Sequence, residues 1–95
     1  MKRHLIVADE LRGLIRHLPP SLKGKIKQAL EEIVTDPSLG KVLKDELSGL
    51  HSYAIGSVRV IYRMGAHAVT LITVGPRKTV YQKAALELKI NYLTK

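Results

Sequence analysis

The sequence contains no cysteine, no phenylalanine and no tryptophan among its 95 residues. Without cysteine the chain has no disulfide, no thiolate ligand for zinc and no cysteine nucleophile. Its aromatic side chains are limited to four tyrosines, so the core must be built mainly from leucine, isoleucine, valine and alanine. The lack of cysteine suits a reducing compartment, and we expect a cytoplasmic protein.

Acidic residues are few and unevenly placed. Sixteen Lys and Arg stand against eight Asp and Glu, which gives a formal net charge of +8. The forty residues from 47 to 86 contain no acid, but they include the cations Arg59, Arg63, Arg77, Lys78 and Lys83. Clustered cations attract polyanions and release their counterions on binding. This pattern favours a nucleic acid or an acidic protein as the partner.

Long apolar runs are also missing. The run at residues 5–8 stops at Asp9-Glu10, which is too short for an export signal, and no segment approaches the roughly 20 apolar residues of a membrane-spanning helix. Histidines and acids show no metal-ligand spacing, so we expect neither a metal nor another cofactor. The length predicts a single domain over residues 1–95.

Apolar periodicity predicts two helices in the first part of the chain. Asp9 is expected to cap the first helix, which Pro19-Pro20 end, and Ser21 is expected to cap the second, which Asp36-Pro37 close. Apolar residues recur at helical spacing in both. They are Leu11, Leu14, Ile15 and Leu18 in the first helix, and Leu22, Ile26, Ala29, Leu30 and Ile33 in the second.

Strands are predicted at residues 3–8, 52–56, 58–64 and 68–74, with glycine-containing turns between the last three. In the third of these strands Val58, Val60 and Tyr62 alternate with Arg59 and Arg63, which indicates one apolar and one basic face. A helix from Thr79 onward completes the chain. We therefore predict a two-layer α+β fold in which an N-terminal strand, a helical hairpin, an antiparallel sheet and a C-terminal helix follow one another.

Three segments contain distinctive sequence motifs. Residues 47–56 read Leu-Ser-Gly-Leu-His-Ser-Tyr-Ala-Ile-Gly, residues 58–63 read Val-Arg-Val-Ile-Tyr-Arg, and residues 74–81 read Val-Gly-Pro-Arg-Lys-Thr-Val-Tyr. In this order and spacing they resemble the RelE/ParE superfamily of toxins from type II toxin-antitoxin systems. The resemblance implies the fold above and an acidic antitoxin as a protein partner. RelE-type members cut messenger RNA on the ribosome without a metal, whereas ParE-type members poison DNA gyrase.

Carried over by position, the resemblance implies catalytic roles for Arg59, Arg77 and Tyr81. This chain differs from the RelE type at Ala54 and Gly56, where RelE-type enzymes have basic residues. The leading hypothesis is a ribosome-dependent, metal-independent mRNA endoribonuclease that inhibits translation. The alternatives are a gyrase inhibitor of the ParE kind and a catalytically weak homologue that mainly binds its antitoxin.

RNA cleavage without a metal requires a group that removes the 2′-hydroxyl proton, cations for the phosphorane and a proton for the leaving 5′-oxygen. Guanidinium groups suit the second task because they grip two phosphate oxygens, and a tyrosine suits proton transfer where neighbouring cations lower its pKa. Structural roles are also possible for these residues. Arg59 could simply lie on a solvated strand face, Arg77 could stabilise a turn, and Tyr81 could pack in the core. Further substrate-binding candidates are Arg63, Lys78, Lys83 and His51.

Overall fold

The computed structural model describes residues 3–94, and the side chains of residues 3–89. Its helices and strands are β1 (His4–Ile6), α1 (Asp9–Arg16), α2 (Pro20–Thr35), β2 (Lys41–Val42), β3 (Leu50–Ile55), β4 (Val58–Met64), β5 (Ala68–Pro76) and α3 (Arg77–Thr94). Two short 3₁₀ helices, η1 (Pro37–Leu39) and η2 (Asp45–Leu47), flank β2. The predicted α+β class is confirmed. None of the helices in residues 3–94 is long and apolar enough to cross a membrane.

The five strands form one sheet in the order β1-β5-β4-β3-β2. The strands β3, β4 and β5 make the predicted antiparallel meander. β1 joins it in parallel, with His4 opposite Ala68, so the sheet is mixed and not wholly antiparallel as predicted. Parallel partners are far apart in sequence, and local periodicity does not report their direction. The two-residue strand β2, which pairs with β3, was not predicted.

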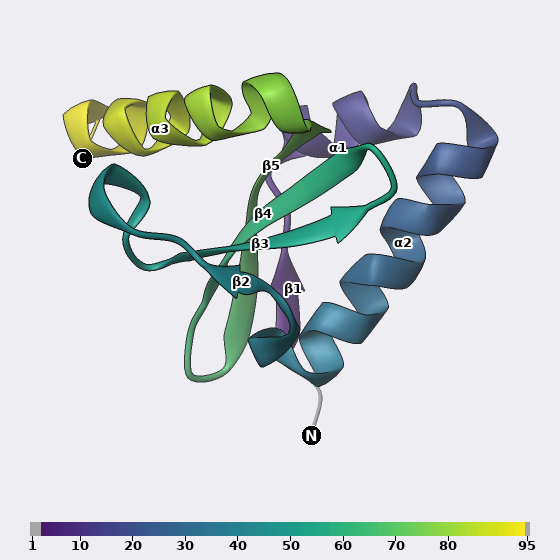
Figure 1. The fold of residues 1–95 in the computed structure, drawn as a ribbon, viewed down its shortest axis with the longest axis horizontal. Helices are drawn as coiled ribbons and strands as arrows, with labels where there is room; N and C mark the ends of the chain where they lie inside the picture. Colours follow the sequence, from purple (N-terminus) through teal and green to yellow (C-terminus); the bar gives the residue numbers. More distant parts are fainter. Residues whose placement is uncertain (1–2, 95) are drawn as a thin grey trace.

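Helices cover both faces of the sheet, and Figure 1 shows the strands lying between α2 and α3. Val60 and Tyr62 point to α1 and α2, as the alternation predicted. The intervening Ile61 is fully buried on the opposite face, against Val80 and Ala84 of α3. The fold therefore has three layers, and the prediction of two layers was wrong. The terminal helix lies across the face that was expected to be open and basic.

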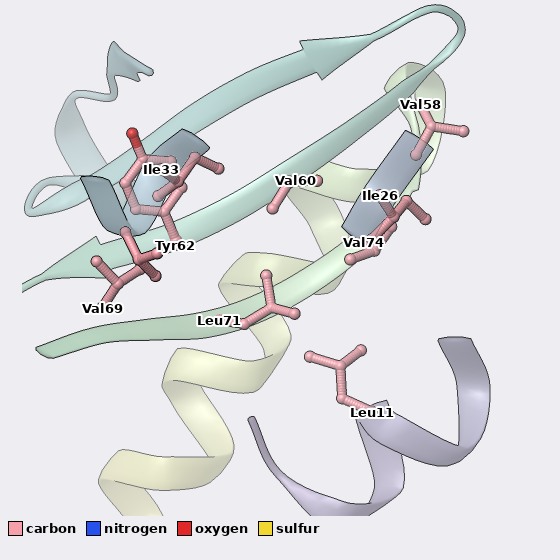
Figure 2. Packing of buried hydrophobic residues seen from close by; sticks show 10 residues of the cluster. Leu11, Ile26, Ile33, Val58, Val60, Tyr62, Val69, Leu71 and Val74 are labelled. Carbon is pink, nitrogen blue, oxygen red and sulfur yellow. The ribbon is translucent and has the colours of Figure 1, made fainter. Parts of the chain in front are cut away.

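The larger of the two buried clusters lies under the helical hairpin. Figure 2 shows Ile26 and Ile33 of α2 and Leu11 of α1 gathered with strand residues such as Leu71. Ile26 and Ile33 are seven residues apart, so they lie on one face of α2, and both are fully buried. Burying each such aliphatic side chain contributes roughly 1.5–3 kcal/mol. This packing fixes the sheet against the helical hairpin, so the strand residues on its other face keep fixed positions under α3.

Both helix starts differ from the prediction. Asp9 is the first residue of α1, and Ala8 occupies the capping position without a side-chain hydrogen bond. Helix α2 begins at Pro20, with Ser21 already inside it. Proline suits a first helical position because its φ angle is preset and its missing N–H has no helical partner there. Asp36 ends α2 as predicted, and its carboxylate accepts a hydrogen bond from the Ser38 N–H at 3.2 Å.

A buried tyrosine ties the connection between α2 and β3 to the sheet. The Tyr62 hydroxyl donates to the Pro37 carbonyl at 2.6 Å and accepts from the Gly40 N–H at 2.9 Å. A Cβ at position 40 would collide with the Tyr62 hydroxyl and ring, so glycine is required there. These contacts fix the chain that leads from η1 into β2.

Candidate functional site

Arg59 lies on β4 and faces the α3 side of the sheet. Its cross-strand neighbours are Ala54 on β3 and Gly75 on β5, which are among the smallest side chains available. The arginine is half-buried, and its Nε has no hydrogen-bond partner within the described part of the chain although the atom is fully covered. A buried donor without a partner costs free energy unless a ligand satisfies it. The position is therefore suited to an anion.

Arg77 is the first residue of α3 and comes directly after the last residue of β5. It is exposed, and it lies two residues beyond Gly75, the cross-strand partner of Arg59. The first N–H groups of a helix have no partners inside the helix, and the helix dipole adds positive potential at that end. Arg77 thus joins Arg59 at the same end of the sheet, where phosphate would be attracted.

Tyr81 follows Arg77 by one helical turn, so the two residues lie on the same side of α3. The Tyr81 ring is half-buried and packs against the cluster that contains Leu50 and Ile61. Its hydroxyl lies 3.3 Å from the Ser52 hydroxyl of β3, at a distance where either group can donate. The ring therefore packs on the core, as one of the two interpretations expected, while the hydroxyl is held at a defined point over the sheet.

Arg59, Arg77 and Tyr81 all lie on the α3 side of the sheet, with Arg77 two residues beyond the cross-strand partner of Arg59 and the Tyr81 hydroxyl over Ser52 of β3. Ser52, which orients the tyrosine, was missed by the sequence reasoning. The signal that identifies it is its parity with Ala54, since residues two apart on a strand point to the same face. Ser52 is 3% exposed, so its hydroxyl is buried beneath the helix and partnered by Tyr81.

Lys83 also reaches this region. Its Nζ lies 3.2 Å from the point that a Cβ of Gly75 would occupy. Lys78 is exposed on α3. Arg63 shares the face of Arg59 but lies four residues further along β4, roughly 13 Å at the usual strand rise. Of these three predicted substrate-binding residues, Lys83 is the one that the structure places against Gly75, the cross-strand partner of Arg59.

His51 lies on the other face of the sheet. Its ring stacks on that of Tyr62, with centroids 5.3 Å apart and planes 18° apart. The sheet therefore separates His51 from Arg59, and the structure does not bring this candidate to the others. The difference follows from strand parity, because β3 begins two residues earlier than predicted and includes His51.

Two tyrosines on the α2 side have raised pKa values. The hydrogen bond from the Tyr53 hydroxyl to the Glu32 carboxylate, 2.7 Å long, raises the pKa of Tyr53, and burial adds to this. Burial raises the pKa of Tyr62, and the hydrogen bond from the Gly40 N–H offsets part of the rise. Both groups stabilise the fold and lie away from Arg59. Within residues 3–94, no three His, Asp or Glu side chains are placed to share a metal ion.

Comparison with known proteins identifies the family. A family model described as the ParE-like toxin of type II bacterial toxin-antitoxin systems matches residues 5–85. No curated protein matches the chain in sequence.

Solved structures share the fold. The toxin-antitoxin complex RelBE2 from Mycobacterium tuberculosis contains a chain that is 25% identical, with a TM-score of 0.71 over 81% of this chain and 100% of that one. The free E. coli toxin RelE, in a doubly substituted form, is 20% identical with a TM-score of 0.73, covering 88% of this chain and 95% of that one. A chain of the YoeB-YefM toxin-antitoxin complex from Staphylococcus aureus is 17% identical, with a TM-score of 0.63 over 77% and 94%. With most of its length matched by the family model, the chain belongs to the ParE-like toxins of type II toxin-antitoxin systems, within the RelE/ParE superfamily.

Proposed function

We propose that this toxin is a ribosome-dependent mRNA endoribonuclease that inhibits translation in the cytoplasm. The observation that carries the proposal is that Arg59, Arg77 and Tyr81 lie on the same side of the sheet as α3, with the buried Nε of Arg59 unpartnered in the described residues. The +8 charge of the chain supports a polyanionic substrate.

The chemistry assigns a task to each side chain. The 2′-oxygen of the RNA forms a bond to phosphorus as the bond from phosphorus to the 5′-oxygen breaks. Arg59 and Arg77 neutralise the charge that grows on the phosphorane oxygens, which is where preorganised cations lower a barrier most. Tyr81 donates the proton that the departing 5′-oxygen takes up, water takes the proton of the 2′-hydroxyl, and the phenolate regains its proton from water. The products are a 2′,3′-cyclic phosphate and a free 5′-hydroxyl.

The test is cleavage of messenger RNA on programmed ribosomes, mapped by primer extension. The wild-type protein should cut within the ribosomal A site, and Arg77→Ala should slow cleavage by about 10-fold or more, the scale of a lost transition-state cation. Arg16→Ala is the matched control, because it removes an equal charge from an exposed position on α1 that is not among the substrate-binding candidates. Intact message in the presence of wild-type protein contradicts the proposal.

A second candidate function is inhibition of DNA gyrase. The match to the ParE-like family and the small residues Ala54 and Gly56 in β3 and its turn favour it, because nothing basic flanks Arg59 on β3. A supercoiling assay separates the two functions. Gyrase that stays fully active with a stoichiometric amount of the protein eliminates this candidate.

We also propose where an acidic antitoxin segment binds. A groove of about 340 Å³ lies beside the edge strand β1, and its lining carries four cations and no acid. Leu5 of β1 is exposed at its edge, and the floor is aliphatic. The lining residues are Leu5, Val7, Arg12, Ile15, Arg16, Lys23, Ile26, Lys27 and Leu30. An apolar floor with a cationic rim complements an amphipathic acidic segment.

Charge reversal tests this interface. Arg12→Glu combined with Arg16→Glu should weaken antitoxin binding by about 10-fold or more, since like charges across an interface repel. Lys41→Glu combined with Lys44→Glu, at the opposite edge of the sheet, removes and reverses the same number of charges and serves as the control. Equal effects of the two pairs would show that only net charge matters.

A further inference from the structure

Lys83 occupies an unusual position for a helix lysine. Its Nζ lies 3.2 Å from where a Cβ of Gly75 would be, and its Cδ lies 3.7 Å from that point. The long side chain therefore runs back from α3 onto the sheet and covers a position without a side chain of its own. A Cβ at position 75 would press on the ammonium group and require it to shift by a few tenths of an ångström.

This position places the ammonium beside Arg59. Gly75 is the direct cross-strand partner of Arg59, and adjacent strands lie about 4.8 Å apart. On its other side Arg59 faces Ala54, which is exposed and small. Arg59 is thus flanked by two positions that leave room above the sheet, and Lys83 closes one of them from above.

We propose that Lys83 is a further substrate-contacting residue, which binds the same phosphate group as Arg59. The covered Nε of Arg59 has no protein partner among the described residues, and the ammonium of Lys83 lies within reach of the same anion. Two cations held on one anion neutralise charge that a single guanidinium leaves uncompensated. Gly75 acts as the positioning residue, because a Cβ there would lie 3.2 Å from the ammonium and displace it slightly. The identification of the anion as an RNA phosphodiester rests on the proposed nuclease function.

The carboxylates near Lys83 set the direction from which the phosphate approaches. Glu10 and Glu87 line the crevice between α1 and α3, and Lys83 lies in the same lining. Their negative charge repels phosphate from that side. The anion therefore reaches Lys83 from the side of Arg59 and Arg77, where positive charge prevails.

A mutant cycle on programmed ribosomes tests the proposal. Lys83→Ala should lower single-turnover cleavage about 10-fold or more, whereas Lys89→Ala, an equal charge loss from an exposed position of the same helix, should lower it by less than about 3-fold. The double variant with Arg59→Ala should lose much less than the product of the two single effects, because groups that bind one phosphate act as a unit. Gly75→Ala should give an intermediate loss, since a neighbour at 3.2 Å must shift by a few tenths of an ångström.

A binding measurement keeps the proposal separate from the proposed function. An RNA oligonucleotide methylated at every 2′-oxygen cannot be cleaved by this chemistry and reports contact alone. Lys83→Ala should reduce the slope of log affinity against log salt by about 0.7, as for one lost phosphate contact to a single strand, and its effect should be coupled to that of Arg59→Ala. If wild-type protein leaves the messenger RNA on programmed ribosomes intact, the proposed nuclease function is excluded. The oligonucleotide measurement would still decide whether Lys83 contacts phosphate. Equal effects of Lys83→Ala and Lys89→Ala, or additivity with Arg59→Ala, would overturn the inference.

Discussion

Removing one oxygen atom from Tyr62 is expected to destabilise the protein strongly. The side chain is completely buried, and its hydroxyl contacts the Pro37 carbonyl at 2.6 Å and the Gly40 N–H at 2.9 Å. Tyr62→Phe leaves two backbone groups without a partner in places where water does not reach them. Each such group typically costs about 1–3 kcal/mol, so the free energy of unfolding should fall by about 2–6 kcal/mol. That is a large share of the roughly 5–15 kcal/mol by which a small domain is stable.

Urea denaturation followed by circular dichroism measures this loss. The midpoint should fall while the slope of the transition stays the same, because the surface exposed on unfolding hardly changes. Tyr53→Phe is the matched control, since it removes the same atom from a half-buried tyrosine whose hydroxyl bonds Glu32 at 2.7 Å. Water replaces that contact, so the control should lose no more than about 1.5 kcal/mol. Equal losses in the two variants would refute the reasoning.

Three further outcomes follow from the same geometry. Gly40→Ala should unfold at a lower urea concentration than wild type, because its Cβ meets the Tyr62 hydroxyl, whereas Gly24→Ala in α2, which meets no atom, should not. The pKa values of Tyr53 and Tyr62 are higher in the folded protein than in the unfolded chain. The unfolded chain therefore loses these protons first above about pH 10, so stability is fully present below that pH and should decline above it, less steeply in Tyr62→Phe. Ser52→Ala should reduce mRNA cleavage by up to about 10-fold with little loss of stability, because one hydrogen bond that orients Tyr81 is worth about 1 kcal/mol.

The sequence was most informative where one local period decides the structure. The alternation of Val58, Val60 and Tyr62 placed these residues correctly on the helical-hairpin face, and the turns at Gly56 and after Met64 are where the meander reverses. Gly56 has a φ angle of +58°, which is the left-handed backbone conformation that glycine adopts without cost. These features depend on residues that are close in sequence, so the local sequence is enough to predict them.

Features that depend on distant partners were missed. The two-residue strand β2 and η1 are held by Tyr62, more than twenty residues away, and no periodicity reports such a contact. The position of α3 was misjudged for a related reason, since the basic alternation of β4 hides the fully buried Ile61 on the same face. On β4, helix α3 packs on the face that carries the two arginines because Ile61 lies between them and contacts the helix.

The candidate site shows the same division. The family motifs indicated Arg59, Arg77 and Tyr81, and all three lie on the α3 side of the sheet. It did not indicate Ser52 or Gly75, whose importance depends on what lies across the sheet from them. His51 was assigned to the loop before β3, and one residue of strand parity puts it on the opposite face. Strand boundaries therefore decide which candidates belong to a site on a sheet.

Primer extension on programmed ribosomes, with wild-type protein and Arg77→Ala side by side, tests the central claim most directly. We predict cuts in the A-site codon that end in a 2′,3′-cyclic phosphate and that the variant produces at least about 10-fold more slowly. Full-length message with the wild-type protein, or cleavage that proceeds equally well without the Arg77 guanidinium, would contradict a phosphate site built on Arg59, Arg77 and Tyr81.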